Sequence, residues 1–193
     1  MEKYLTFIDI ESKHYGLKIL AYCLMPNHVH FIVVPENDDS LGKVFKYANM
    51  KYSQYHNRKI GSGGHLFQGR FFSSVMDERY VIACARYIER NPLRARMVKN
   101  PCEWEWSSAK VHCEMNKHDT FGINDLFDYI DYLQKDWKKF IEEPDDRDEI
   151  KMIREQTRKG RPLGEDPFVK KLEKMLNRFL MLKPHGRPTK NRK

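Results

Sequence analysis

The spacing of hydrophobic residues predicts a helix and a β-hairpin at the start of the chain. Hydrophobic positions between Tyr4 and Tyr15 recur at helical spacing, and Gly16 is suited to end that helix because glycine readily adopts the left-handed conformation. Apolar runs over 17–25 and 28–34 read as strands. A Pro-Asn pair between them favours a turn, so the two strands are expected to pair as a hairpin.

A longer helix is expected from Ser40, a residue type that caps helix N-termini. Its apolar residues recur at i, i+3, i+4, i+7, i+11 and i+14 as far as Tyr55. The glycine-rich segment 61–64 then predicts a loop.

Aromatic residues alternate with polar ones from Leu66 to Met76, which predicts a third strand. Asp77 is placed to cap a helix over 78–90. That helix should end or kink before Pro92, because the residue preceding a proline disfavours helical geometry.

The pattern changes after Trp106. An aromatic-rich helix is expected over 125–141, an acidic linker over 142–149, and a basic amphipathic helix over 167–182. A Gly-Arg-Pro tripeptide occurs at 160–162 and again at 186–188. Each copy resembles the core of an AT-hook, which enters the minor groove, although a solvated basic tail is an equal interpretation.

Charge is distributed unevenly over the 193 residues. The chain carries a net charge of +8, yet the segment 147–193 alone carries +9, with 15 basic and 6 acidic residues. A near-neutral body with a basic extension points to a polyanionic partner, most often nucleic acid. No apolar stretch reaches the roughly 18 residues that span a bilayer, and no export signal is recognised, so we expect a cytoplasmic protein without a membrane segment.

Two histidines provide the first candidate chemistry. His28 and His30 lie two apart in a predicted strand, where residues at that spacing point to the same face. Both imidazoles are therefore able to converge on one metal ion. Two unrelated surface histidines at a strand edge remain the alternative for this motif taken alone.

A tyrosine and an asparagine form the second group of residues with candidate chemistry. Tyr87 and Asn91 are four residues apart on a predicted helix, so hydroxyl and carboxamide share a face. A tyrosine hydroxyl can act as a nucleophile and an amide oxygen can bind a metal ion. The alternative is that Tyr87 belongs to the buried stripe and Asn91 merely ends the helix.

Four spaced motifs, taken in order, resemble those of the REP-associated tyrosine transposases, single-tyrosine members of the HUH nuclease superfamily. They are Met25-Pro26-Asn27-His28-Val29-His30, Gly64-His65-Leu66-Phe67-Gln68-Gly69-Arg70, Tyr87-Ile88-Glu89-Arg90-Asn91-Pro92 and Trp106-Ser107-Ser108. The resemblance implies an α+β domain, namely a ferredoxin-like antiparallel sheet with helices on one face. It runs to about residue 112, and the family often has similar basic Gly-Arg-Pro segments further on.

The resemblance also implies a site and a reaction. His28, His30 and Asn91 would hold Mg²⁺ or Mn²⁺, and Tyr87 would attack a phosphodiester of single-stranded or hairpin DNA, leaving a 5′-phosphotyrosine and a free 3′-hydroxyl. We expect a bacterial protein that associates with the nucleoid. We expect it to be a monomer or a homodimer.

The sequence departs from the family pattern at its start. The family has a strand before the first helix, whereas here the helix begins almost at Met1. We therefore expect that strand to be missing from the sheet, which leaves an edge unpaired. The expected domains are a catalytic domain over 1–113, a helical connector over 114–146 and a basic DNA-binding tail over 147–193.

Basic and polar residues near aromatic ones are candidates for DNA contact, because such surfaces neutralise phosphates and stack bases. They are Lys43, Lys46, Lys51, Arg58, Gln68, Arg70, Arg161 and Arg187.

Two other interpretations stay open. In the first, the chain is a catalytically decayed or truncated DNA-binding protein that recognises hairpin or curved DNA. In the second, it is an interaction module in which the histidine pair is incidental. A zinc site at His112, Cys113 and His118 is a minor alternative, because no second clustered pair accompanies them and none of the four cysteines forms a CxxC motif.

Overall fold

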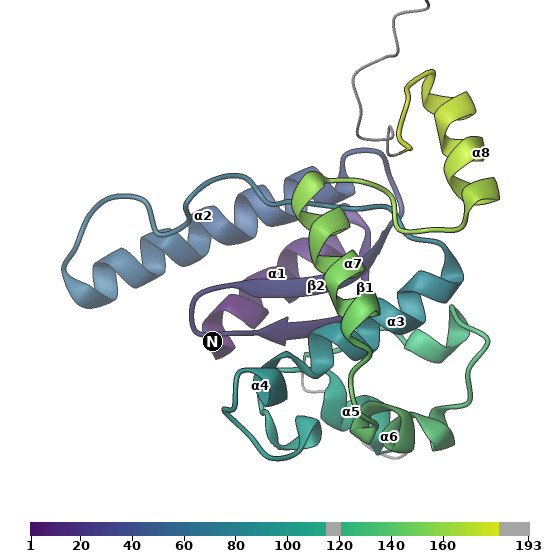
Figure 1. Cartoon of the computed structure of the whole chain (residues 1–193). Helices are drawn as coiled ribbons and strands as arrows, with labels where there is room; N and C mark the ends of the chain where they lie inside the picture. Colours follow the sequence, from purple (N-terminus) through teal and green to yellow (C-terminus); the bar gives the residue numbers. More distant parts are fainter. Residues whose placement is uncertain (115–120, 182–193) are drawn as a thin grey trace, which may run out of the picture.

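The computed structural model describes residues 1–114 and 121–181, which contain a two-stranded sheet and eight α-helices (Figure 1). In chain order the elements are α1 (Glu2–Tyr15), β1 (Leu17–Leu24), β2 (Val29–Pro35), α2 (Ser40–Ile60), α3 (Glu78–Glu89), α4 (Asn91–Arg94), the 3₁₀ helix η1 (Pro101–Glu103), α5 (Ala109–Cys113), the 3₁₀ helix η2 (Leu126–Asp128), α6 (Gln134–Glu142), α7 (Arg147–Lys159) and α8 (Asp166–Leu176).

The predicted hairpin is confirmed. β1 and β2 pair antiparallel, with Cys23 opposite His30. An irregularity between Ile19 and Ala21 shifts the register within β1. The opposite edge of β1 binds a short segment at Trp106, whose carbonyl accepts a 2.8 Å hydrogen bond from the backbone N–H of Leu24.

The α+β class is confirmed, and helices pack on both faces of this hairpin. β1 is buried along almost its whole length, so side chains on both of its faces need apolar neighbours. In Figure 1, α1 lies behind the hairpin and α7 in front of it. We call the two resulting groups the α1 cluster, which includes Tyr4, Ile8, Leu17, Tyr22 and Val44, and the α3 cluster, which includes Leu20, Cys23, Ile32, Ile88, Trp137, Ile153 and Leu163.

Local signals place most helix ends. Gly16 ends α1 with φ of 68°, and Asp77 caps α3 by accepting a 3.0 Å hydrogen bond from the N–H of Tyr80, both as predicted. Ser40 does not cap α2, since Asp39 occupies the capping position. The buried Ser40 hydroxyl instead donates to the Tyr15 carbonyl at 2.6 Å and so ties α2 to the end of α1.

The strand predicted over 66–76 is wrong. The segment is irregular and largely exposed, and only Met76 forms an isolated bridge, with Leu163. Its alternating aromatic residues serve ring contacts instead: Phe67 lies 6.0 Å from the Tyr4 ring and Phe71 lies 5.1 Å from the Phe45 ring. The alternation of aromatic and polar residues therefore reflects rings packed onto helices and not a strand with a hydrogen-bond ladder.

The single helix predicted over 125–141 is also wrong. The Asp125 carboxylate accepts a 2.9 Å hydrogen bond from the N–H of Phe127 and starts the short η2, and Leu133 is extended before α6 begins. A side chain that bonds the backbone two residues ahead favours a turn over a helix. The helix expected over 167–182 ends early, at Leu176, because Asn177 is left-handed with φ of 46°.

The C-terminal segment packs against the body. Ile153 of α7 and Leu163 are 2% exposed and belong to the α3 cluster together with Ile88. Residues on both sides of the boundary predicted at 113 therefore share one core; the division into three domains stays a prediction.

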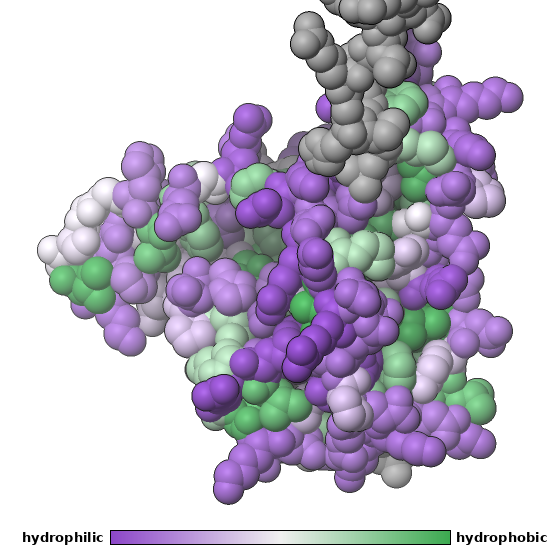
Figure 2. Space-filling view, in the orientation of Figure 1, coloured by the Kyte–Doolittle hydropathy of each residue, from purple (hydrophilic) through white to green (hydrophobic). Residues whose placement is uncertain are grey.

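Within the described ranges, no helix is long and apolar enough to cross a membrane. The face seen in Figure 2 is mainly hydrophilic.

Candidate active site

The hairpin brings the two histidines together on the side of the sheet that faces α3. Their ring centroids are 5.0 Å apart. His30 shares a strand face with Ile32, which packs in the α3 cluster. Strand alternation thus directs the His30 imidazole toward α3, and His28, the residue before β2, lies against Asn91.

Tyr87 and Asn91 come from successive helices. α3 ends at Glu89, Arg90 with ψ close to 0° separates the two helices, and Asn91 is the first residue of α4. The backbone bonds from Arg90 N–H to the Arg86 carbonyl and from Arg94 N–H to the Arg90 carbonyl, both 3.0 Å, carry the chain across this break in near-helical geometry. The tyrosine and the asparagine consequently stay on the same side of the segment.

These four predicted residues meet in one place. The Asn91 Nδ2 lies 3.1 Å from the His28 Nε2, and the Tyr87 ring centroid lies 6.0 Å from that of His30. Asn91 is buried, His30 and Tyr87 are half-buried and His28 is exposed, so the group opens to solvent on one side.

Both histidines favour the neutral form. Desolvation lowers the pKa of His28 below its ordinary value, and burial, helped by His28 and Arg94, lowers the pKa of His30 to about 4. The His28 Nδ1 lies 2.6 Å from the Asn27 Oδ1, which accepts a hydrogen bond from it. The His28 Nε2 is then the unprotonated nitrogen and accepts a hydrogen bond from the Asn91 Nδ2. Two neutral imidazoles and an amide oxygen form a donor set that fits a divalent cation.

The described residues contain no group of three or more histidine, cysteine, aspartate and glutamate side chains arranged to hold a metal ion.

Two arginines hold Tyr87. The Arg94 guanidinium lies over the Tyr87 ring, 4.3 Å from its centroid, and also donates to the Tyr87 carbonyl. The Arg154 Nε, from α7, donates to the Tyr87 hydroxyl at 3.3 Å. The hydroxyl thus points toward a basic environment built from two distant parts of the sequence.

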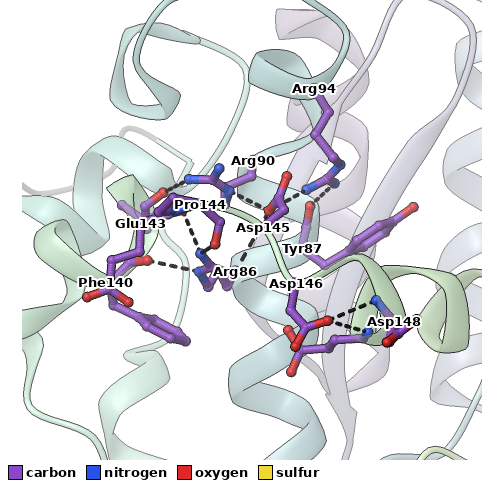
Figure 3. Close-up of polar contacts among 12 residues, drawn as sticks. Arg86, Tyr87, Arg90, Arg94, Phe140, Glu143, Pro144, Asp145, Asp146 and Asp148 are labelled. Carbon is purple, nitrogen blue, oxygen red and sulfur yellow. Dashed lines mark hydrogen bonds and ion pairs between the residues drawn. The ribbon is translucent and has the colours of Figure 1, made fainter.

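A buried network fixes the helix that bears the tyrosine (Figure 3). Arg86, Arg90 and Arg94 all face Asp145, at 3.9, 2.7 and 3.6 Å. Arg86 also donates to the carbonyls that end α6, those of Phe140, Glu143 and Pro144, at 2.6–2.8 Å. The acidic linker expected over 142–149 is shorter than predicted, because α6 extends to Glu142 and α7 begins at Arg147. Within it, Asp145 anchors α3 and α4.

The predicted DNA-binding residues are spread over several elements rather than gathered. Lys43, Lys46, Lys51 and Arg58 lie along α2, which projects from the body in Figure 1. Lys43 pairs with Asp39 at 2.6 Å and Lys51 pairs with the buried Glu11.

The other predicted contacts lie in loops. Gln68 and Arg70 are exposed in the segment 61–76, and Arg161 is half-buried just after α7. Gly160 has φ of 60° and ends α7, so the first Gly-Arg-Pro tripeptide forms a helix terminus against the body. Arg187 lies outside the described residues.

The residues of the zinc alternative have other partners. His112 is buried and its Nδ1 lies 2.6 Å from Glu89, which is fully buried. Cys113 faces Cys102, with 2.7 Å between the sulfurs, and His118 lies outside the described residues.

Sequence reasoning missed Arg94 and Arg154. Arg94 had a signal, since it lies three residues after Asn91 and so on the same helical side. Arg154 belongs to a row of basic residues on α7 at helical spacing, but nothing in that row indicates which helix it packs against.

Comparison with protein families gives one match. Residues 1–91 match the model described as "Transposase IS200 like", and this range includes His28, His30, Tyr87 and Asn91. Somewhat less than half of the chain is thus similar to IS200-like transposases. Searches of curated proteins and of solved structures gave no match.

Proposed function

We propose that the protein nicks single-stranded DNA and transfers the strand, with Tyr87 as the nucleophile. The observation that carries the proposal is the convergence of His28, His30, Asn91 and Tyr87, with 3.1 Å between Asn91 and His28 and 6.0 Å between the rings of His30 and Tyr87. The match of residues 1–91 to IS200-like transposases supports it independently.

The reaction is a transesterification at phosphorus. The Tyr87 hydroxyl oxygen attacks a phosphodiester and loses its proton to solvent, while the bond from phosphorus to the 3′ oxygen breaks and that oxygen takes up a proton. The products are a 5′-phosphotyrosine and a 3′-hydroxyl. Because one phosphoester replaces another, attack by a 3′-hydroxyl can reverse the step and join strands.

His28 and His30, through ring nitrogens, and Asn91, through its amide oxygen, would hold Mg²⁺ or Mn²⁺. The ion would supply Lewis-acid stabilisation of charge that develops on the phosphate oxygens. Asn27 keeps the His28 Nε2 unprotonated by accepting a hydrogen bond from Nδ1, so this nitrogen would bind the ion in place of its hydrogen bond from the Asn91 Nδ2.

The substrate we propose is a short palindromic hairpin of the REP type, in line with the resemblance of the four motifs. Exposed residues of the segment 61–76 and of α2 would contact it, among them Arg58 on α2 and Arg70, which precedes the exposed rings of Phe71 and Phe72 in the chain. An exposed ring can stack on any base, and a neighbouring cation neutralises phosphate.

The test is incubation of the full chain with labelled single-stranded hairpin DNA and Mn²⁺, followed by denaturing electrophoresis. We expect a slower-migrating covalent adduct with the parent and none with Tyr87→Phe. Tyr55→Phe, a half-exposed tyrosine on α2, is the matched control and should form the adduct. An adduct of equal yield with Tyr87→Phe would mean that another residue attacks; binding without any adduct would favour a DNA-binding protein that lacks catalysis.

A further inference from the structure

A groove of about 800 Å³ lies next to Tyr87, between α7 on one side and the α4 region on the other. It is lined by five basic residues, two acidic ones and one apolar one: Arg94, Arg147, Lys151, Arg154, Arg158, Asp145, Glu155 and Ile150. We call it the α7 groove.

The sequence of α7 separates a core face from a basic face. Arg147, Lys151, Arg154 and Arg158 follow one another at i, i+4, i+7 and i+11, and all four are exposed. Ile153, on the other side of the helix, is buried in the α3 cluster. The apolar face thus holds α7 in place and the basic row faces the groove.

The two acidic residues of the groove are already paired. Asp145 faces three arginines, of which Arg90 is closest at 2.7 Å, and Glu155 pairs with Lys159 at 3.8 Å. Their charges are offset by these partners, so the groove attracts anions.

The groove reaches the nucleophile. Arg154 lines it and donates to the Tyr87 hydroxyl at 3.3 Å, and Arg94 lines it and lies over the Tyr87 ring. An anion in the groove is therefore next to the reacting oxygen.

We propose that the α7 groove binds the sugar-phosphate backbone of the single DNA strand that Tyr87 attacks, and that Arg154 positions the Tyr87 hydroxyl against it. The proposal rests on the proposed function of Tyr87. The basic row from Arg147 to Arg158 is about 16 Å long at 1.5 Å per residue, enough for several successive phosphates. The lining contains cationic side chains for phosphates and no aromatic ring on which a base would stack.

The first experiment measures binding to a fluorescent 20-nucleotide single strand by anisotropy, with EDTA present so that no nicking occurs. Lys151→Gln combined with Arg158→Gln removes two groove charges. Lys135→Gln combined with Lys138→Gln, on the exposed side of α6 and outside the groove, makes the same charge change and is the control. Thermal melts check that all variants fold.

Binding by the groove has a defined salt signature. The affinity of a single strand falls with salt with a log–log slope of about −0.7 per phosphate neutralised. We expect the groove variant to lose about 1.4 units of slope. The ratio of the parent's affinity to that of the variant should therefore shrink about sevenfold between 50 and 200 mM salt. The control should keep the parent slope. An equal loss in both variants would show that net charge, not the groove, attracts DNA.

The second experiment tests Arg154 by rates of adduct formation. Arg154→Gln should lower the rate at saturating DNA at least tenfold with a smaller change in KM, and Arg154→Lys should recover part of it. An unchanged rate at saturating DNA would overturn the positioning role.

The two proposals can fail separately. If the parent binds with the expected slope but forms no adduct, Tyr87 is not the nucleophile and the groove stands as a strand-binding site. If the parent forms the adduct while the groove variant binds like the parent, the groove proposal alone is overturned. A parent that does not bind single strands overturns it as well.

Discussion

Glu89 is the most constrained charged residue of the tyrosine helix. It is fully buried, and its carboxylate accepts hydrogen bonds from Ser108 and from the Trp137 Nε1 at 3.0 Å, with the His112 Nδ1 at 2.6 Å. A buried carboxylate persists only when its lone pairs are satisfied in this way. Glu89 thereby links α3 to α5 and α6.

Replacing Glu89 by alanine should therefore lower the free energy of unfolding strongly. Three buried partners lose their acceptor, and removal of one member of a buried charged network costs about 3–5 kcal/mol. Urea unfolding should reveal this loss. Glu105→Ala, at an exposed acid, serves as the control and should change the free energy of unfolding by no more than about 0.5 kcal/mol. A similar, small effect at both positions would contradict the role given to the network.

The histidine pair supports a prediction about metal binding. A ligand that binds only the folded state stabilises it by about 2.7 kcal/mol at a hundredfold excess over its Kd. Mn²⁺ should raise the melting temperature of the parent and leave those of His28→Ala and His30→Ala unchanged. His14→Ala, which removes an exposed imidazole from α1, should respond like the parent. If His30→Ala still gains stability from Mn²⁺, the ligand assignment is wrong.

At the scale of elements, the turn after α1 depends on a single glycine. Gly16 has φ of 68°, and a Cβ at this position would lie 2.8 Å from a Glu36 carboxylate oxygen. The residue therefore has both a conformational and a steric reason to be glycine.

Gly16→Ala should lower the free energy of unfolding by about 1–2 kcal/mol from the left-handed conformation, with the close contact adding to it. The matched control is Gly42→Ala, within α2, where a Cβ has nothing within 4 Å. That variant should gain about 0.5–1 kcal/mol, because alanine favours a helix over glycine. Differential scanning calorimetry of the two variants should therefore show shifts of opposite sign.

Elements with local signals could be predicted, and those defined by distant contacts could not. The hairpin, α1 and α3 carry their own start or stop residues, such as Gly16 and Asp77. The segment 66–76 lacks any such signal: its aromatic alternation comes from ring contacts with Tyr4 and Phe45 on α1 and α2, which are remote in sequence.

The candidate site divides in the same way. Strand alternation and helical spacing placed His28 with His30 and Tyr87 near Asn91 on each element. Their meeting is a tertiary event that the sequence suggested only through family resemblance. The contact between Arg154 and Tyr87 joins residues 67 positions apart. The sequence of α7 is rich in charge, and such a pattern by itself predicts a solvated tail.

For the whole molecule, the basic C-terminal segment is part of the core up to Leu163. Ile153 is 2% exposed within the α3 cluster. Truncation of an isoleucine in such a site costs about 2–5 kcal/mol. Ile153→Ala should therefore melt well below the parent by circular dichroism, and Ile150→Ala, at a partly exposed position, should melt closer to it. An unchanged melt with Ile153→Ala would show that α7 is an independent tail.

The arginines beside Tyr87 have a mechanical consequence. In the proposed covalent state, tension on the DNA strand is applied to α3 at its last turn. Arg86 and Arg90, on either side of Tyr87, bind this turn to the carbonyls at the end of α6 and to Asp145. The force is then distributed over α3 and α6, which these hydrogen bonds hold together, and does not act on the end of α3 alone.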